Sequence, residues 1–108
     1  MYNSKIIGLG KYLPDNVVTN ADLEKIMETS DAWIQERTGI KERRHIVKDS
    51  DDSTSSMGVK ASKIAIERAG LLPQDIDLIL FATLSPDYYF PGSGVLVQEA
   101  LISGGQTN

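Results

Sequence analysis

The chain's single tryptophan, Trp33, precedes Arg37 by four residues in the stretch SDAWIQERTGIKERR. On a helix, residues four apart share one face, with their Cβ atoms about 5–6 Å apart. An indole offers a flat surface to an adenine ring, and a guanidinium can hold a phosphate through two hydrogen bonds. A pair placed in this way can grip an adenine nucleotide, with the indole on the base and the guanidinium on a phosphate. From the spacing alone, however, the better interpretation is a buried core tryptophan beside an arginine that pairs with an acid such as Asp31 or Glu36.

A glycine motif near the start of the chain suggests a nucleotide-binding turn less specifically. Gly8 and Gly10 follow a short apolar segment, as in the first half of a dinucleotide fingerprint. However, Leu13 stands where that fingerprint needs its third glycine, and Pro14 follows in place of a helix. A simple turn is therefore the better interpretation.

The acidic run and the single histidine are also weak candidates for a site. Asp49, Asp51 and Asp52 lack the glycine and the distal glutamate of a calcium loop, which favours a solvated loop. His45 lies among basic residues and has no cysteine or serine partner in a recognisable motif. These features favour a surface histidine over a catalytic base, and we expect no metal site.

The composition of the chain excludes several classes of protein. A length of 108 residues is about one domain, and a net charge of −4 argues against a nucleic-acid-binding surface. The chain has no cysteine, so it has no disulfide, thiolate nucleophile or thiolate metal site. Its beginning, MYNSKIIGLGKYLPD, does not resemble a signal peptide, and its longest apolar run, residues 78–82, is too short to span a membrane. We therefore expect a protein that binds neither nucleic acid nor membranes.

The apolar pattern predicts a strand, a helix and a second strand that form one βαβ unit. The predicted strands are residues 5–8 and 77–83, whose consecutive apolar residues are typical of strands covered on both faces. The helix between them runs over about residues 55–69, with Gly70 as its stop. Two parallel strands are too few for a two-faced sheet, so the pattern indicates the beginning of a larger α/β domain.

Cap residues and composition predict the remaining segments. A helix begins at Thr19 or Asn20 and includes Met27, and a shorter one runs from the cap signal at residues 29–31 to Gly39. Beyond these we expect loops over residues 41–55 and 85–91, a helix over 94–101 and an unstructured tail over 103–108.

Four stretches together resemble the N-terminal part of β-ketoacyl-acyl carrier protein synthase III: KIIGLGKYLPDNVVTNADLEK, TSDAWIQERTGIKERR, STSSMGVKASKIAIERAGL and DIDLILFATLSPDYYFP. The resemblance covers roughly residues 2–101, and the pattern TSDxWIxxRTGIxxR is its strongest signature. It implies a partial thiolase-like α/β fold with parallel strands flanked by helices. Residues 1–108 would form the N-terminal part of the first of two similar halves, with the remainder of the fold absent from this chain.

The resemblance also implies a cytoplasmic acyltransferase that initiates fatty acid synthesis and is a homodimer when complete. In that family a cysteine thiolate takes an acyl group from acyl-coenzyme A. A histidine and an asparagine then assist decarboxylation of malonyl-acyl carrier protein, whose carbanion attacks the acyl-enzyme. Coenzyme A thioester is a substrate there, and no cofactor is implied. The alternatives are a relative with another acyl starter, of the polyketide or quinolone type, and a non-catalytic fragment for coenzyme A binding or assembly.

Residue by residue, the resemblance places a coenzyme A site on Thr29, Trp33 and Arg37. This shifts the interpretation of Trp33 from a core residue to an adenine stacker. The resemblance also assigns Phe90 to the dimer interface, where it would reach the acyl pocket of the partner subunit. None of the family's three catalytic residues has a match in this chain, so we expect the 108 residues alone to be inactive. The ending ISGGQTN departs from the family's pattern.

Overall fold

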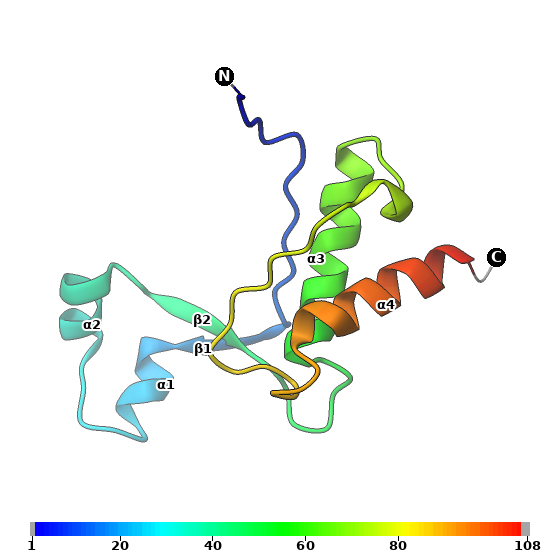
Figure 1. Cartoon of the computed structure of the whole chain (residues 1–108). Helices are drawn as coiled ribbons and strands as arrows, with labels where there is room; N and C mark the ends of the chain where they lie inside the picture. The colour runs from blue at the N-terminus through cyan, green and yellow to red at the C-terminus, as the bar shows by residue number, and fades with distance from the viewer. Residues whose placement is uncertain (1, 107–108) are drawn as a thin grey trace. The chain divides into compact units, whose positions relative to one another are not determined.

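The computed structural model describes residues 2–106, which fall into two compact units. The larger unit joins Met1–Tyr12 to Asp51–Asn108, and the smaller one is Leu13–Ser50. None of the helices among the described residues is long and apolar enough to cross a membrane. Figure 1 shows the elements, which in chain order are β1 (Asn16–Thr19), α1 (Asn20–Glu24), α2 (Asp31–Thr38), β2 (Glu42–His45), α3 (Thr54–Arg68), the 3-10 helix η1 (Pro73–Asp75) and α4 (Ser93–Gln106).

The smaller unit is built on a two-stranded antiparallel ladder. β1 pairs with β2 in a register that places Asn16 opposite His45 and Thr19 opposite Glu42. Thr19 also begins α1, because its hydroxyl accepts a hydrogen bond from the Asp22 amide while the Asp22 carboxylate accepts one from the Thr19 amide. This reciprocal capping box satisfies backbone donors that a helix start otherwise leaves unpaired.

Helix α2 has the two ends that its sequence predicts. The Ser30 hydroxyl accepts a hydrogen bond from the Trp33 amide at 3.1 Å, which caps the first turn. Gly39 ends the helix in the left-handed conformation at φ 72°, where a side chain would be strained. Ile34 is the buried residue of this helix, so a single apolar side chain anchors it to the rest of the smaller unit.

Packing of α3 against α4 forms the core of the larger unit. Val97 and Leu101 of α4 lie one turn apart and are both buried. Gly58 of α3 allows the Phe81 ring to lie close to the helix, because a side-chain carbon there would lie 2.7 Å from Cε2 of Phe81, whereas its distance of 3.6 Å from Cγ2 of Val97 would be an ordinary contact. Burial of each large aliphatic side chain contributes about 1.5–3 kcal/mol.

The two segments expected to be parallel strands are extended but are not paired in a ladder. Residues 5–8 and 77–83 both run along α3, in the direction opposite to the helix (Figure 1). A side-chain carbon at Gly8 would collide with the Ala65 carbonyl of α3, so this motif serves close packing. Across residues 2–106, however, no backbone hydrogen bond joins either segment to a neighbour. The helix that covers them is confirmed, whereas the sheet needs strands that the described residues do not supply.

Three further segments differ from their predicted structure. The predicted loop over residues 41–55 contains β2, which forms because β1 offers it a pairing partner. Helix α1 ends at Glu24, and Met27 lies exposed beyond it. Helix α4 continues to Gln106 through part of the predicted tail, because each residue added to a formed helix gains one hydrogen bond. Residues 107–108 of that tail lie outside the described residues.

Candidate functional site

Trp33 and Arg37 stack on one another on the surface of α2. The Trp33 side chain is 54% exposed, and the guanidinium carbon of Arg37 lies 5.6 Å from the centroid of its ring. This separation is within the range of a cation–π interaction. Within residues 2–106, Arg37 forms no ion pair with Asp31 or Glu36. The alternative of a buried tryptophan beside a paired arginine therefore does not describe this structure.

A shallow pocket lies at the start of α2, and Thr29 and Trp33 both line it. Its volume is about 230 Å³, and it is lined by Glu28, Thr29, Ser30 and Trp33. A pocket that encloses a whole small molecule typically measures about 300–1,000 Å³. This pocket is therefore sized for part of a ligand, such as one ring that lies against the indole.

The charges around this pocket differ from one side to the other. Glu28 is one of the residues that line the pocket, and its negative charge disfavours a phosphate nearby. The positive charge of Arg37 lies instead over the indole. The arrangement therefore suits an uncharged planar ring in the pocket and an anionic group at Arg37.

A polar network centres on the buried side chain of Asn20. The Asn20 amide nitrogen donates to Oδ1 of Asp31 at 2.7 Å and to the Ile40 carbonyl at 2.9 Å. Its amide oxygen accepts from Nη2 of Arg43 at 2.7 Å. The hydrogen bond from Asn20, followed by one from Gln35, lowers the pKa of Asp31 below its ordinary value. The sequence singled out Asn20 only as a possible helix cap, whereas Thr19 takes that role.

The other basic residues of the motif contribute to local structure. Nη1 of Arg43 donates to the Val18 carbonyl at 3.3 Å, and Nη1 of Arg44 donates to the Pro14 carbonyl at 2.9 Å. Both arginines thus tie the strands and the preceding turn together. His45 is exposed at the end of β2, as expected of a surface histidine.

Phe90 lies in the larger unit, in an exposed loop that is anchored by Asp87. Phe90 is 94% exposed. The Asp87 carboxylate accepts from the Ser55 amide at 2.7 Å, the Ser55 hydroxyl at 2.9 Å and the Ser93 hydroxyl at 3.1 Å. Desolvation by burial raises the pKa of Asp87, but hydrogen bonds from serines outweigh it and leave the pKa lowered. A charged carboxylate therefore joins the starts of α3 and α4 and fixes the base of the Phe90 loop.

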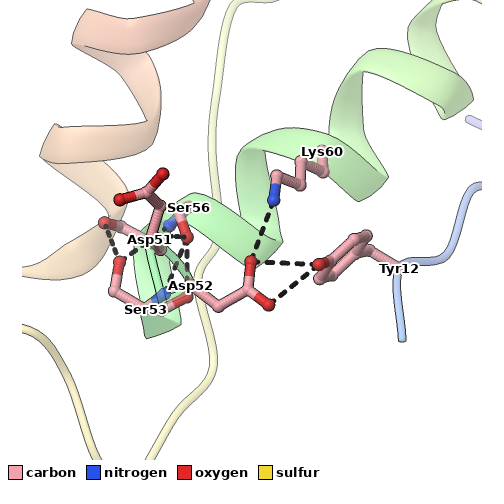
Figure 2. Close-up of polar contacts among 7 residues, drawn as sticks. Tyr12, Asp51, Asp52, Ser53, Ser56 and Lys60 are labelled. Carbon is pink, nitrogen blue, oxygen red and sulfur yellow. Dashed lines mark hydrogen bonds and ion pairs between the residues drawn. The ribbon is translucent and has the colours of Figure 1, made fainter. Parts of the chain in front are cut away.

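A second polar cluster joins the N-terminal segment to α3 (Figure 2). The Tyr12 hydroxyl donates to both oxygens of the Asp52 carboxylate, at 3.0 and 2.8 Å, and Nζ of Lys60 lies 2.9 Å from Oδ1 of Asp52. Nζ of Lys60 also lies 4.4 Å from the centroid of the Tyr12 ring. The bond from Lys60, with that from Tyr12, lowers the pKa of Asp52, and the bond to Asp52 raises the pKa of Lys60. The acidic run thus supplies a structural ion pair, and the described residues contain no group of acidic or histidine side chains placed to hold a metal ion.

Comparisons with known proteins place this geometry in context. No protein-family model matches the chain. The chain is 57% identical over 99 residues to β-ketoacyl-acyl carrier protein synthase III 1 of Bacillus cereus, a match that covers 92% of the chain and 31% of the relative. It is 50% identical over 101 residues to the synthase III of Natranaerobius thermophilus, covering 94% of the chain and 30% of that protein. The chain thus spans about a third of the length of the curated relatives it matches.

Solved structures give the same result for the fold. The crystal structure of 3-oxoacyl-acyl carrier protein synthase III from Aquifex aeolicus superposes with a TM-score of 0.84 at 50% identity, covering 95% of this chain and 32% of that one. The priming β-ketosynthase of the R1128 polyketide biosynthetic pathway superposes with a TM-score of 0.82 at 32% identity, covering 94% of this chain and 30% of that one. The partial thiolase-like α/β fold implied by the sequence motifs is therefore confirmed.

Proposed function

We propose that this chain, a homologue of the N-terminal third of β-ketoacyl-acyl carrier protein synthase III, is the coenzyme A-contacting segment of a fatty-acid-initiating condensing enzyme. The complete enzyme would join acyl-coenzyme A and malonyl-acyl carrier protein, and release coenzyme A, carbon dioxide and 3-oxoacyl-acyl carrier protein. The observation that carries the proposal is the half-exposed Trp33 with Arg37 stacked on it, in a chain 57% identical to a synthase III.

Each site residue has a role in this proposal that its surroundings support. Trp33 stacks on the adenine ring, Thr29 lines the pocket that receives this ring, and Arg37 binds a phosphate of coenzyme A. Phe90, exposed on its anchored loop, contributes to the acyl pocket of the partner subunit in a cytoplasmic homodimer. The nucleophilic thiolate comes from outside these residues, because the chain has no cysteine.

Two other functions have one supporting observation each. The TM-score of 0.82 to a priming β-ketosynthase favours a condensing enzyme with another acyl starter. The absence of cysteine from the 108 residues favours a non-catalytic piece that binds coenzyme A or assists assembly. Condensing activity of the complete polypeptide would exclude the non-catalytic piece. The acyl starter that the polypeptide prefers would then distinguish fatty acid initiation from a condensing enzyme with another starter.

The test begins with the intact mass of the native polypeptide that carries this segment. A mass near 11.8 kDa would favour the non-catalytic piece, whereas a mass about three times larger fits the proportion of the relatives that the chain covers. The larger polypeptide is then supplied with malonyl-acyl carrier protein and a panel of acyl-coenzyme A starters. We expect release of coenzyme A and formation of 3-oxoacyl-acyl carrier protein. A complete polypeptide that binds coenzyme A thioesters but never condenses them would overturn the proposal.

A further inference from the structure

We propose that Asn20 is the positioning residue of the Trp33–Arg37 pair and holds α2 at both of its ends through one side-chain amide. The role toward coenzyme A rests on the proposed function, whereas the role toward the Trp33 indole does not. Asn20 is 2% exposed and touches neither Trp33 nor Arg37 through any hydrogen bond, so it acts through the elements that it joins.

The geometry of the three hydrogen bonds carries this inference. Asp31, which accepts from the Asn20 amide at 2.7 Å, is the first residue of α2. Ile40, whose carbonyl accepts at 2.9 Å, follows directly after the Gly39 that ends α2. The oxygen of the same amide accepts from Arg43 of β2 at 2.7 Å. One buried side chain therefore connects both ends of the helix to the strand pair, and Trp33 and Arg37 lie between these ends.

Apolar packing alone fixes α2 only weakly. Ile34 is its buried residue, and a helix that buries a single apolar side chain can rotate or shift with little loss of contact area. Hydrogen bonds in a buried, fully paired network are directional and specify one arrangement. The backbone amide of Asn20 adds a further bond to the Lys41 carbonyl at 3.2 Å, which fixes Asn20 itself against the segment that enters β2.

The asparagine side chain matches this set of partners group by group. Its amide supplies two donors, which the Asp31 carboxylate and the Ile40 carbonyl use, and one acceptor, which Arg43 uses. An aspartate at this position would face two acceptors without a donor. An alanine would remove all three hydrogen bonds and with them the link between α2 and β2.

The first test uses the intrinsic fluorescence of the 108-residue chain, in which Trp33 is the single tryptophan. Emission and acrylamide quenching of Trp33 are measured together with its response to added coenzyme A. We expect Asn20→Ala to broaden the Trp33 emission band and to change the quenching of Trp33 by acrylamide. We also expect it to weaken coenzyme A binding roughly tenfold, which is within the range of a lost base–aromatic stack.

Thr19→Ala is the matched control, because it removes the adjacent cap of α1 and leaves the link from Asn20 to Asp31 in place. We expect it to lower stability while it keeps the Trp33 signal and the affinity. If Thr19→Ala and Asn20→Ala changed both readouts equally, Asn20 would be a general stabilising residue and the inference would fail.

An exchange of the two partners tests the link itself. Asn20→Asp alone places two carboxylates together and should abolish the wild-type Trp33 signal. The double variant Asn20→Asp/Asp31→Asn restores the bond between positions 20 and 31, although the Ile40 carbonyl still faces a carboxylate, and should recover part of the signal and affinity that Asn20→Asp loses. This comparison also decides the case in which Asn20→Ala fails to fold, since an exchange without recovery would overturn the inference. A wild-type chain that ignores coenzyme A would count against the proposed function, and the Trp33 readout would still test the positioning role.

Discussion

The guanidinium carbon of Arg37 lies 5.6 Å from the centroid of the Trp33 indole, on a tryptophan that remains 54% exposed. An exposed cation–π contact of this kind is worth about 0.5–1 kcal/mol. A contribution of this size biases the arginine toward the indole but is smaller than the roughly 2 kcal/mol of rotamer entropy that an arginine side chain carries. The ring and the cation thus lie side by side on one surface of α2.

The first prediction concerns the stacking surface. Trp33→Ala in the complete enzyme should weaken binding of a coenzyme A thioester by about 1–3 kcal/mol, the scale of base–aromatic stacking. Isothermal titration calorimetry measures the change. Tyr2→Ala is the control, because Tyr2 is a fully exposed aromatic residue of the other unit. Equal affinity of the wild type and a folded Trp33→Ala variant would remove adenine stacking from the site.

The second prediction concerns the charge that accompanies the ring. Arg37→Ala should also weaken coenzyme A binding, and this loss should shrink at high salt because exposed charges are screened. Lys63→Ala removes one positive charge from an exposed position on α3 and should leave the affinity and its salt dependence nearly unchanged. The measurement is the dissociation constant at several salt concentrations. A loss independent of salt would indicate that Arg37 acts through packing on the indole alone.

The parts of the fold that the sequence predicts well are those set by neighbouring residues. Ser30 and Gly39 delimit α2 as expected, because a cap hydroxyl and a left-handed glycine act within one turn. β2 was missed because the residues ERRH have no alternating apolar pattern, and the strand exists through its pairing with β1. Residues 77–83 were expected to pair as a strand, but pairing depends on partners that the described residues do not provide.

The candidate site shows the same division between local and distant determinants. Trp33 and Arg37 lie close to each other because they are four residues apart on a helix. The role of Asn20 has no such local signal, because its partners lie 11, 20 and 23 positions away in the chain. Its position directly after Thr19 instead suggested a helix cap, a role that one residue can fill at a time.

The third prediction concerns the chemistry of the chain by itself. Incubation of the 108-residue chain with radiolabelled acetyl-coenzyme A should leave no covalent label, because the chain has no cysteine to form a thioester. Label on the denatured protein is counted before and after hydroxylamine, which cleaves thioesters. The complete condensing enzyme serves as the positive control. Stoichiometric label released by hydroxylamine would contradict the prediction.

The fourth prediction concerns the stability of the larger unit as a function of pH. In this unit, hydrogen bonds from Lys60 and Tyr12 to the Asp52 carboxylate lower the pKa of Asp52 below its ordinary value of 3.8. The folded state therefore favours the charged carboxylate. This stabilisation is present above pH 3.8 and is lost as the pH falls through the lowered pKa. Asp52→Asn should therefore reduce the free energy of unfolding at neutral pH, and the difference from wild type should shrink in acid.

Denaturant unfolding followed by far-ultraviolet circular dichroism measures this difference, because Trp33 belongs to the other unit and reports on it instead. Asp51→Asn is the control, because it removes the exposed carboxylate next to Asp52, whereas the bonds from Tyr12 and Lys60 go to Asp52. A difference between wild type and Asp52→Asn that stayed constant down to acid pH would show that the charge of Asp52 contributes nothing to stability.

The fifth prediction is that the isolated chain associates with itself. Residues 77–83 are extended, their backbone groups lack a ladder partner among residues 2–106, and Leu80 is 87% exposed. The same segment borders a groove of about 570 Å³, whose apolar lining residues include Leu78 and Leu101. Unpaired strand edges and exposed apolar surface are templates for pairing between chains. The net charge of −4 opposes association, but salt screens this repulsion and leaves the short-range attraction intact.

Sedimentation velocity at several protein concentrations tests this expectation at physiological salt. Leu80→Lys should reduce association, because a charged residue on a strand edge discourages pairing. Ile26→Lys, which replaces an exposed apolar residue of the smaller unit, should have a weaker effect. Amide exchange of residues 77–83 provides the second measurement, with fast exchange expected in any monomer. An 11.8 kDa monomer at every concentration, with slow exchange in this segment, would show that these residues complete a fold by themselves and would contradict both this prediction and the assignment of the chain to a larger α/β domain.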